Sequence, residues 1–94
     1  MSPSRRPTPA QRRILRMLCK PDTHLRISGG YGAWADISRY GHYADNVNLR
    51  TARALAARRD WLEATPPAAP SYYTYRITDA GRAAVAAAQK KEGE

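Results

Sequence analysis

The chain has 94 residues, and its 16 Lys and Arg against 8 Asp and Glu give a formal net charge of +8. A chain of this length supports one compact domain with a single small core, and it leaves no room for a separate substrate domain. The single cysteine excludes a disulfide framework and a paired-cysteine zinc site, and the basic excess favours binding to polyanions, chiefly nucleic acid. No apolar stretch is long enough for a membrane span or a signal peptide, so we expect a soluble, cytoplasmic protein that binds no membrane.

The N-terminal segment predicts a flexible arm followed by a helix. Residues 1–7 are rich in Pro, Ser and Arg without periodicity, which is typical of a disordered basic arm. Residues 9–20 place apolar side chains on one side of a helical wheel and cations on the other. Thr8 suits the cap of this helix, and Gln11 stands where a capping box needs its second member. Pro21 is expected to end it.

The next two elements are expected to be a short strand and a second helix. Residues 23–28, THLRIS, alternate apolar and polar side chains, as in a half-buried strand. Residues 33–40, AWADISRY, place Ala, Trp, Ile and Tyr near helical spacing, and Gly41 is a suitable helix stop.

The C-terminal third of the chain predicts a β-hairpin and a closing helix. The runs WLEA and SYYTYRI flank the proline-rich bend TPPAAP, and both read as strands. In the second run Tyr73 and Tyr75 are expected to face the core and Tyr72 the solvent, with a base-stacking platform as the alternative. The stretch TDAGRAAVAAAQKK predicts a helix capped by Thr78, and residues 91–94 are expected to form a disordered tail.

The aromatic and titratable side chains have mostly structural interpretations. Trp34 and Trp61 are expected to anchor the core because the chain has no Phe, although stacking on bases is an alternative. The spacing of His, Asp, Glu and Cys suggests neither acid–base catalysis nor metal binding, so we expect no enzyme and no cofactor. A nuclease is a weaker alternative.

The element order over residues 8–90 resembles a winged helix-turn-helix domain. The segment RTARALAARRDWLEA looks like a recognition helix running into a wing, and YTYRITDAGRAAV looks like the second wing strand with the closing helix. The pattern Y-x-I-T-x-x-G-R within it is familiar from bacterial regulators of the MarR and PadR kind. The resemblance implies an α+β fold with a three-helix core, a β-hairpin wing with its tip at 66–70, and a C-terminal helix. It further implies that a recognition helix enters the major groove of DNA.

The expected recognition helix, about residues 48–60 with Asn46 or Asn48 as its cap, has one face of small and cationic side chains. Alanine lets the backbone approach the floor of a groove, and arginine can donate paired hydrogen bonds to O6 and N7 of guanine. An ordinary solvated surface is the alternative interpretation. The candidates for contact with base edges are Arg50, Thr51, Arg53, Ala54 and Ala57.

We therefore interpret the chain as a sequence-specific double-stranded DNA-binding protein, a small transcriptional regulator of bacterial or phage type. Phosphate contacts would hold the register on DNA and make the affinity depend steeply on salt. The candidates for phosphate contact are Arg5, Arg6, Arg39 and Arg58.

Two features favour a different class of function, a winged-helix module that binds a protein partner as an adaptor or inhibitor of a host factor. The wing tip TPPAAP has no Lys or Arg, which makes wing contact with the minor groove doubtful. The last helix also has a strip of small side chains that packs internally or, together with the first helix, forms a two-fold homodimer. That strip consists of Ala80, Ala84, Ala87 and Ala88.

Overall fold

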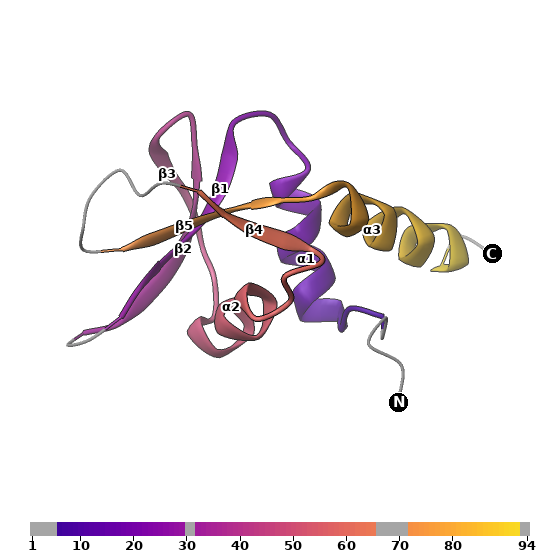
Figure 1. Ribbon diagram of the computed structural model, residues 1–94, viewed down its shortest axis with the longest axis horizontal. Coiled ribbons are helices and arrows are strands. Elements are labelled where there is room, and N and C mark those ends of the chain that lie inside the picture. Colours follow the sequence, from indigo (N-terminus) through magenta and orange to yellow (C-terminus); the bar gives the residue numbers. More distant parts are fainter. Residues whose placement is uncertain (1–5, 30–31, 66–71, 93–94) are drawn as a thin grey trace.

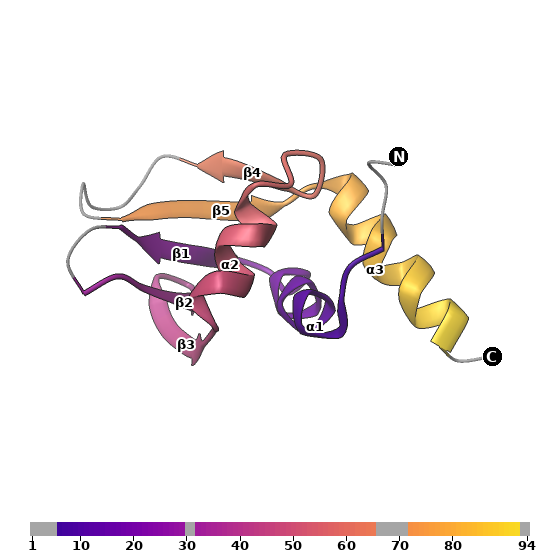
Figure 2. The same ribbon diagram turned by 90° about the horizontal axis from the view of Figure 1, so that it is seen from below.

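The computed structural model describes residues 6–29, 32–65 and 72–92, with side chains described up to residue 87. Within these ranges the chain is an α+β fold of three helices and a five-stranded antiparallel sheet. Helices α1 and α2 cover one face of the sheet, and α3 extends away from the end of β5 (Figures 1 and 2). The sheet order is β3-β2-β1-β5-β4. The elements are α1 (Pro9–Leu18), β1 (Thr23–Ser28), β2 (Trp34–Arg39), β3 (His42–Asn46), α2 (Leu49–Ala56), β4 (Leu62–Thr65), β5 (Tyr73–Ile77) and α3 (Asp79–Glu92).

Helix α1 begins with the capping box that the sequence predicts. The backbone N–H of Gln11 donates to Oγ1 of Thr8 over 3.2 Å, and the N–H of Thr8 donates to Oε1 of Gln11 over 3.0 Å. These two bonds satisfy groups that a helix start leaves unpaired. The helix ends at Leu18, two residues earlier than predicted, and buries the side chains of Ile14, Leu15 and Leu18.

The predicted helix over residues 33–40 is wrong, and with it the expected three-helix core. Trp34–Arg39 forms β2, which pairs with β1 on one side and with β3 on the other. Arg39 pairs with His42, so Tyr40 and Gly41 form a two-residue turn in which both φ angles are positive, 54° and 81°. Such a turn matches the twist of a β-hairpin.

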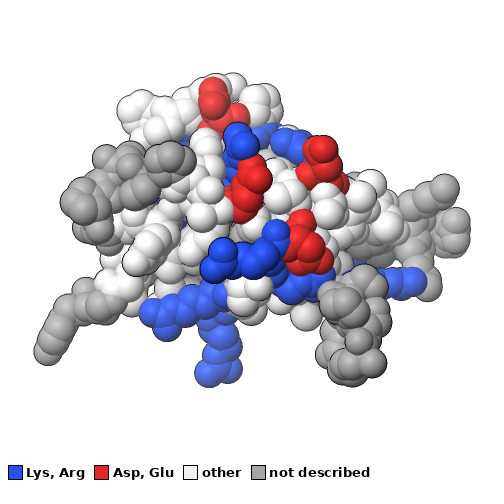
Figure 3. Space-filling model, in the orientation of Figure 1, with Lys and Arg blue, Asp and Glu red and all other residues white. Residues whose placement is uncertain are grey.

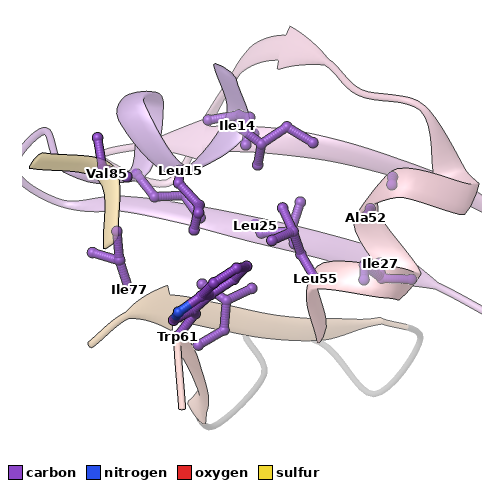
Figure 4. Packing of buried hydrophobic residues seen from close by; sticks show 13 residues of the cluster. Ile14, Leu15, Leu25, Ile27, Ala52, Leu55, Trp61, Ile77 and Val85 are labelled. Carbon is purple, nitrogen blue, oxygen red and sulfur yellow. The ribbon is translucent and has the colours of Figure 1, made fainter. Parts of the chain in front are cut away.

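The core lies between the sheet and the helices. Leu15 of α1, Leu55 of α2 and Leu25 of β1 are fully buried, and their side chains point toward one another (Figure 4). Trp61 is 4% exposed within the same cluster, which confirms its predicted anchoring role. Trp34 is 40% exposed, so the corresponding prediction for this tryptophan is wrong. It belongs to the face of β2 that the helices do not cover.

The hairpin of β4 and β5 forms where the sequence predicts it. Tyr75 pairs with Leu25 and is half-buried against the core, as expected. Tyr73 pairs with the buried Ile27 and shares that face, but it is 64% exposed rather than buried. The strands extend beyond α2 at this end of the sheet (Figure 2), so helix cover does not reach Tyr73.

The two remaining helices differ from their predicted bounds. Helix α2 ends at Ala56 instead of residue 60, and its cap is Asn48, whose Oδ1 accepts from the N–H of Thr51 over 3.1 Å. Helix α3 runs to Glu92, so residues 91 and 92, expected in the tail, are helical. Its predicted cap is present, since Oγ1 of Thr78 accepts from the N–H of Gly81. None of the helices in the described part of the chain has the length and apolar character needed to cross a membrane.

Candidate nucleic-acid interface

Helix α2 presents the small, cationic face that the sequence predicts. Arg50, Arg53, Ala54 and Ala57 are exposed and form what we call the α2 stripe. The opposite side of the helix carries Ala52 and Leu55, both 0% exposed, which fix α2 against the sheet. Because the helix is anchored on one side only, the α2 stripe is left open to a partner. Thr51 lies at the boundary and is half-buried, with its hydroxyl 3.4 Å from Oδ1 of its cap residue.

The arginines of the α2 stripe differ from most other arginines of the fold. Within the described part of the chain, Arg50 and Arg53 form no ion pair or hydrogen bond. Several other arginines of the described ranges are paired with a carboxylate of the same chain. These pairs are Arg13–Asp45, Arg26–Asp36, Arg58–Asp60 and Arg76–Glu63. A guanidinium without an internal partner keeps all its donors for a ligand.

Arg58, a candidate phosphate contact, is held by its own chain. Its Nε and Nη2 atoms donate to the carboxylate of Asp60 over 3.0 and 2.6 Å, and its guanidinium lies 3.4 Å from the centre of the Trp61 ring. The hydrogen bond from Arg58 lowers the pKa of Asp60. The side chain therefore fastens the turn after α2, and its use for DNA would require breaking these contacts.

The remaining phosphate candidates are spread over the molecule. Arg6 is exposed and lines a hollow of about 450 Å³ together with Asp60 and Trp61, close to the end of α2. Arg39 is half-buried, and its Nε atom is buried without a hydrogen-bond partner in the described structure. It lies four residues along β2 from Ala35, roughly 13 Å at the rise of a strand, whereas the carbonyl of Ala35 accepts from the N–H of Val47, two residues before α2. Arg5 and the wing tip at 66–70 lie outside the described residues.

Cationic side chains stand at the edge of the molecule where α2 lies. In Figure 3 several Lys and Arg side chains project from the lower edge, where α2 lies in Figure 1, whereas others lie among the acidic side chains higher up. Cations that project without neighbouring carboxylates favour attraction of a polyanion to this edge.

Sequence reasoning missed a second group of side chains, on the sheet face opposite α2. Arg26 and Asp36 pair across β1 and β2, with Nε–Oδ1 and Nη2–Oδ2 distances of 2.7 and 2.8 Å. The rings of Trp34 and Tyr72 lie beside this pair. The alternation of Arg26 with Leu25 and Ile27 indicates a polar sheet face, but Asp36 and Trp34 come from a segment predicted to be a helix, and Tyr72 is far away in the sequence.

The described residues contain no group of three or more His, Cys, Asp or Glu side chains placed to hold a metal ion. Comparisons of the chain with models of known protein families, with curated proteins and with solved structures found no match.

Proposed function

We propose that the protein binds double-stranded DNA in a sequence-specific manner, as a small transcriptional regulator, with α2 in the major groove. The observation that carries the proposal is the α2 stripe, in which two arginines without an internal partner alternate with exposed alanines on a helix anchored from behind. The net charge of +8 supports the same conclusion because it provides general attraction to the phosphate backbone.

The dimensions and chemistry of α2 suit a groove. A helix with its side chains is about 10–12 Å across, which fits the major-groove width of about 12 Å, and the eight residues of α2 span roughly 12 Å along its axis. Arg50 and Arg53 are proposed to donate paired hydrogen bonds to guanine, and the methyl groups of Ala54 and Ala57 are proposed to contact thymine methyls. Thr51, at the edge of the α2 stripe, is proposed to be the last residue of the helix face that contacts bases.

We further propose a winged-helix arrangement in which α2 is the recognition helix and the β4–β5 hairpin is the wing. The hairpin follows α2 directly in the chain, and its strand β5 lies beside β1 in the sheet. The β2–β3 hairpin occupies the chain position that a helix holds in a helix-turn-helix unit. A homodimer through α1 and α3 is part of the proposal, because exposed Ala80 and Ala87 of the predicted strip allow close approach of two helices. Ala84 of that strip is half-buried against the core, and the side chain of Ala88 lies outside the described residues.

Selection of binding sites from a pool of random duplexes tests the proposal. We expect an enriched site. The logarithm of its binding constant should fall linearly with the logarithm of the salt concentration, with a slope of about −0.9 for each phosphate neutralised. A palindromic site with half-sites about one helical turn apart would support the dimer. Absence of duplex binding at low salt would contradict the proposal and favour the protein-partner alternative.

A further inference from the structure

The sheet face opposite α1 and α2 has no helix over it in the described part of the chain, yet several of its polar side chains are buried. Asp36, Ser38 and Thr74 are 8%, 4% and 8% exposed. They come from β2 and β5, on either side of β1. Because no helix covers this face in the described ranges, we attribute the burial of these polar groups to close packing among neighbouring side chains of the same face.

A bidentate ion pair organises this surface. The side chains of Arg26 and Asp36 are 16% and 12% exposed, and two hydrogen bonds join them. Burying such a pair costs a large part of what the two charges gain from each other, so it is weak support for stability. The pair does, however, fix the orientation of Arg26, because two parallel hydrogen bonds to one carboxylate hold the guanidinium in a single plane.

Two aromatic rings complete what we call the ring cluster, Arg26, Trp34 and Tyr72. The ring centroids of Trp34 and Tyr72 are 5.8 Å apart at an interplanar angle of 51°. The guanidinium carbon of Arg26 lies 5.9 Å from the first centroid and 5.6 Å from the second. Trp34 remains 40% exposed, so a flat apolar surface next to a fixed cation faces the solvent.

The ring cluster borders a hollow that we call the sheet hollow. Its volume is about 230 Å³, below the usual range for a drug-sized ligand but sufficient for a single ring system. Hydroxyl groups and an imidazole supply both donors and acceptors around it. The sheet hollow is lined by His24, Arg26, Ser38, Gly41, Thr65, Tyr72 and Thr74.

We propose that the sheet hollow and the ring cluster form a binding site for an unpaired base of single-stranded nucleic acid. A nucleobase has a π-face that stacks on aromatic rings and on guanidinium planes, and polar edges that pair with hydroxyl and imidazole groups. Tyr72 and Arg26 belong to both the cluster and the hollow, so one base can stack while its edge reaches Ser38 and Thr74. The site goes beyond duplex binding by α2, because it lies on the opposite face of the sheet.

The test compares a short single-stranded oligothymidylate with an abasic strand of the same length and charge, at fixed salt. Binding is followed by anisotropy of the labelled strand and by quenching of tryptophan fluorescence. We expect the normal strand to bind at least 5-fold more tightly than the abasic strand. The Trp34→Leu variant should lose about 5- to 100-fold in affinity for the normal strand and almost nothing for the abasic one.

Tyr73→Leu is the matched control, because Tyr73 is an exposed aromatic residue next to Tyr72 on the other face of the sheet. It should leave single-strand binding unchanged, and circular dichroism should show that both variants fold. A double variant, Arg50→Ala with Arg53→Ala, should keep single-strand binding even if it loses duplex binding, which separates this proposal from the function of α2. Equal binding of the two strands, or equal losses in the two aromatic variants, would overturn the base site.

Discussion

Gly81 near the start of α3 permits a close contact that no other residue allows. A Cβ atom at this position would lie 2.5 Å from the carbonyl oxygen of Trp61 and 2.7 Å from Cγ1 of Ile77. The same carbonyl accepts the N–H of Thr78 over 2.9 Å, so it is fixed by the backbone and cannot move aside cheaply. We therefore predict that Gly81→Ala destabilises the protein, although replacing Gly by Ala within a helix usually stabilises it.

The size of the effect follows from two opposing contributions. Replacing Gly by Ala in a helix normally stabilises by about 1 kcal/mol, because Ala loses less backbone entropy. Overpacking a rigid site costs about 1–3 kcal/mol, and a contact of 2.5 Å with a backbone oxygen belongs at the upper end. The net loss is about 1–2 kcal/mol, which lowers the Tm of a domain of this size by roughly 5–15 °C.

Thermal and urea unfolding followed by circular dichroism measure this loss. Ala86→Gly is the control, because Ala86 is exposed on the same helix and should lose about 1 kcal/mol through helix propensity alone. If Gly81→Ala proves more stable than the unchanged protein, the close packing of α3 on the turn after α2 is not as described.

Three further changes test the core and the ion pairs. Leu55→Ala should lower the free energy of unfolding by about 2–5 kcal/mol in urea titration, because a fully buried leucine leaves a cavity. Arg26→Ala should cost about 3 kcal/mol, since Asp36 then keeps a buried charge without its partner, whereas replacing both residues by apolar ones should restore most of the stability. The hydrogen bond from Arg58 lowers the pKa of Asp60 below its ordinary 3.8, so the Arg58–Asp60 pair contributes to the free energy of unfolding above that pH. This contribution is lost as the pH falls through the lowered pKa of Asp60. Asp60→Asn should therefore show a smaller loss of stability on acidification than the unchanged protein.

Elements with local signals were predictable from the sequence. The capping box of Thr8 and Gln11 and the alternation in residues 23–28 involve residues within a few positions of one another, as does the cap of α2, for which the sequence left Asn46 and Asn48 open and the structure has Asn48. Trp61 was also identified correctly as a core residue. For the caps and the strand, neighbouring side chains carry the information, whereas the prediction for Trp61 came from composition, because the chain has no Phe.

The β2–β3 hairpin was not predictable because its signals have two interpretations. Gly41 adopts a positive φ, which suits the end of a helix as well as a two-residue hairpin turn. The spacing of Trp34 and Ile37 also fits a helix, but their side chains lie on opposite faces of β2. The strand is selected by its pairing with β1, including the contact of Asp36 with Arg26, and such partners are invisible to local patterns.

The α2 stripe was predictable because helical period alone separates Arg50 and Arg53 from the buried Leu55. The role of Arg58 was not, because it depends on where the helix ends and on a contact with the Trp61 ring. Base stacking by Trp34 and by the tyrosine run was an alternative interpretation of the sequence, but their association with Arg26 was not predictable, since the ring cluster unites side chains from three separate segments of the chain.

The most direct test of the reading role of α2 is the ratio of affinities for a selected duplex and a scrambled duplex at one salt concentration. We predict that Arg50→Ala and Arg53→Ala each reduce this ratio by about 5- to 100-fold, the value of one paired contact with a guanine. Arg76→Ala, which removes the same charge from a residue already paired with Glu63, should leave the ratio unchanged. An unchanged ratio in both α2 variants would contradict base reading by this helix.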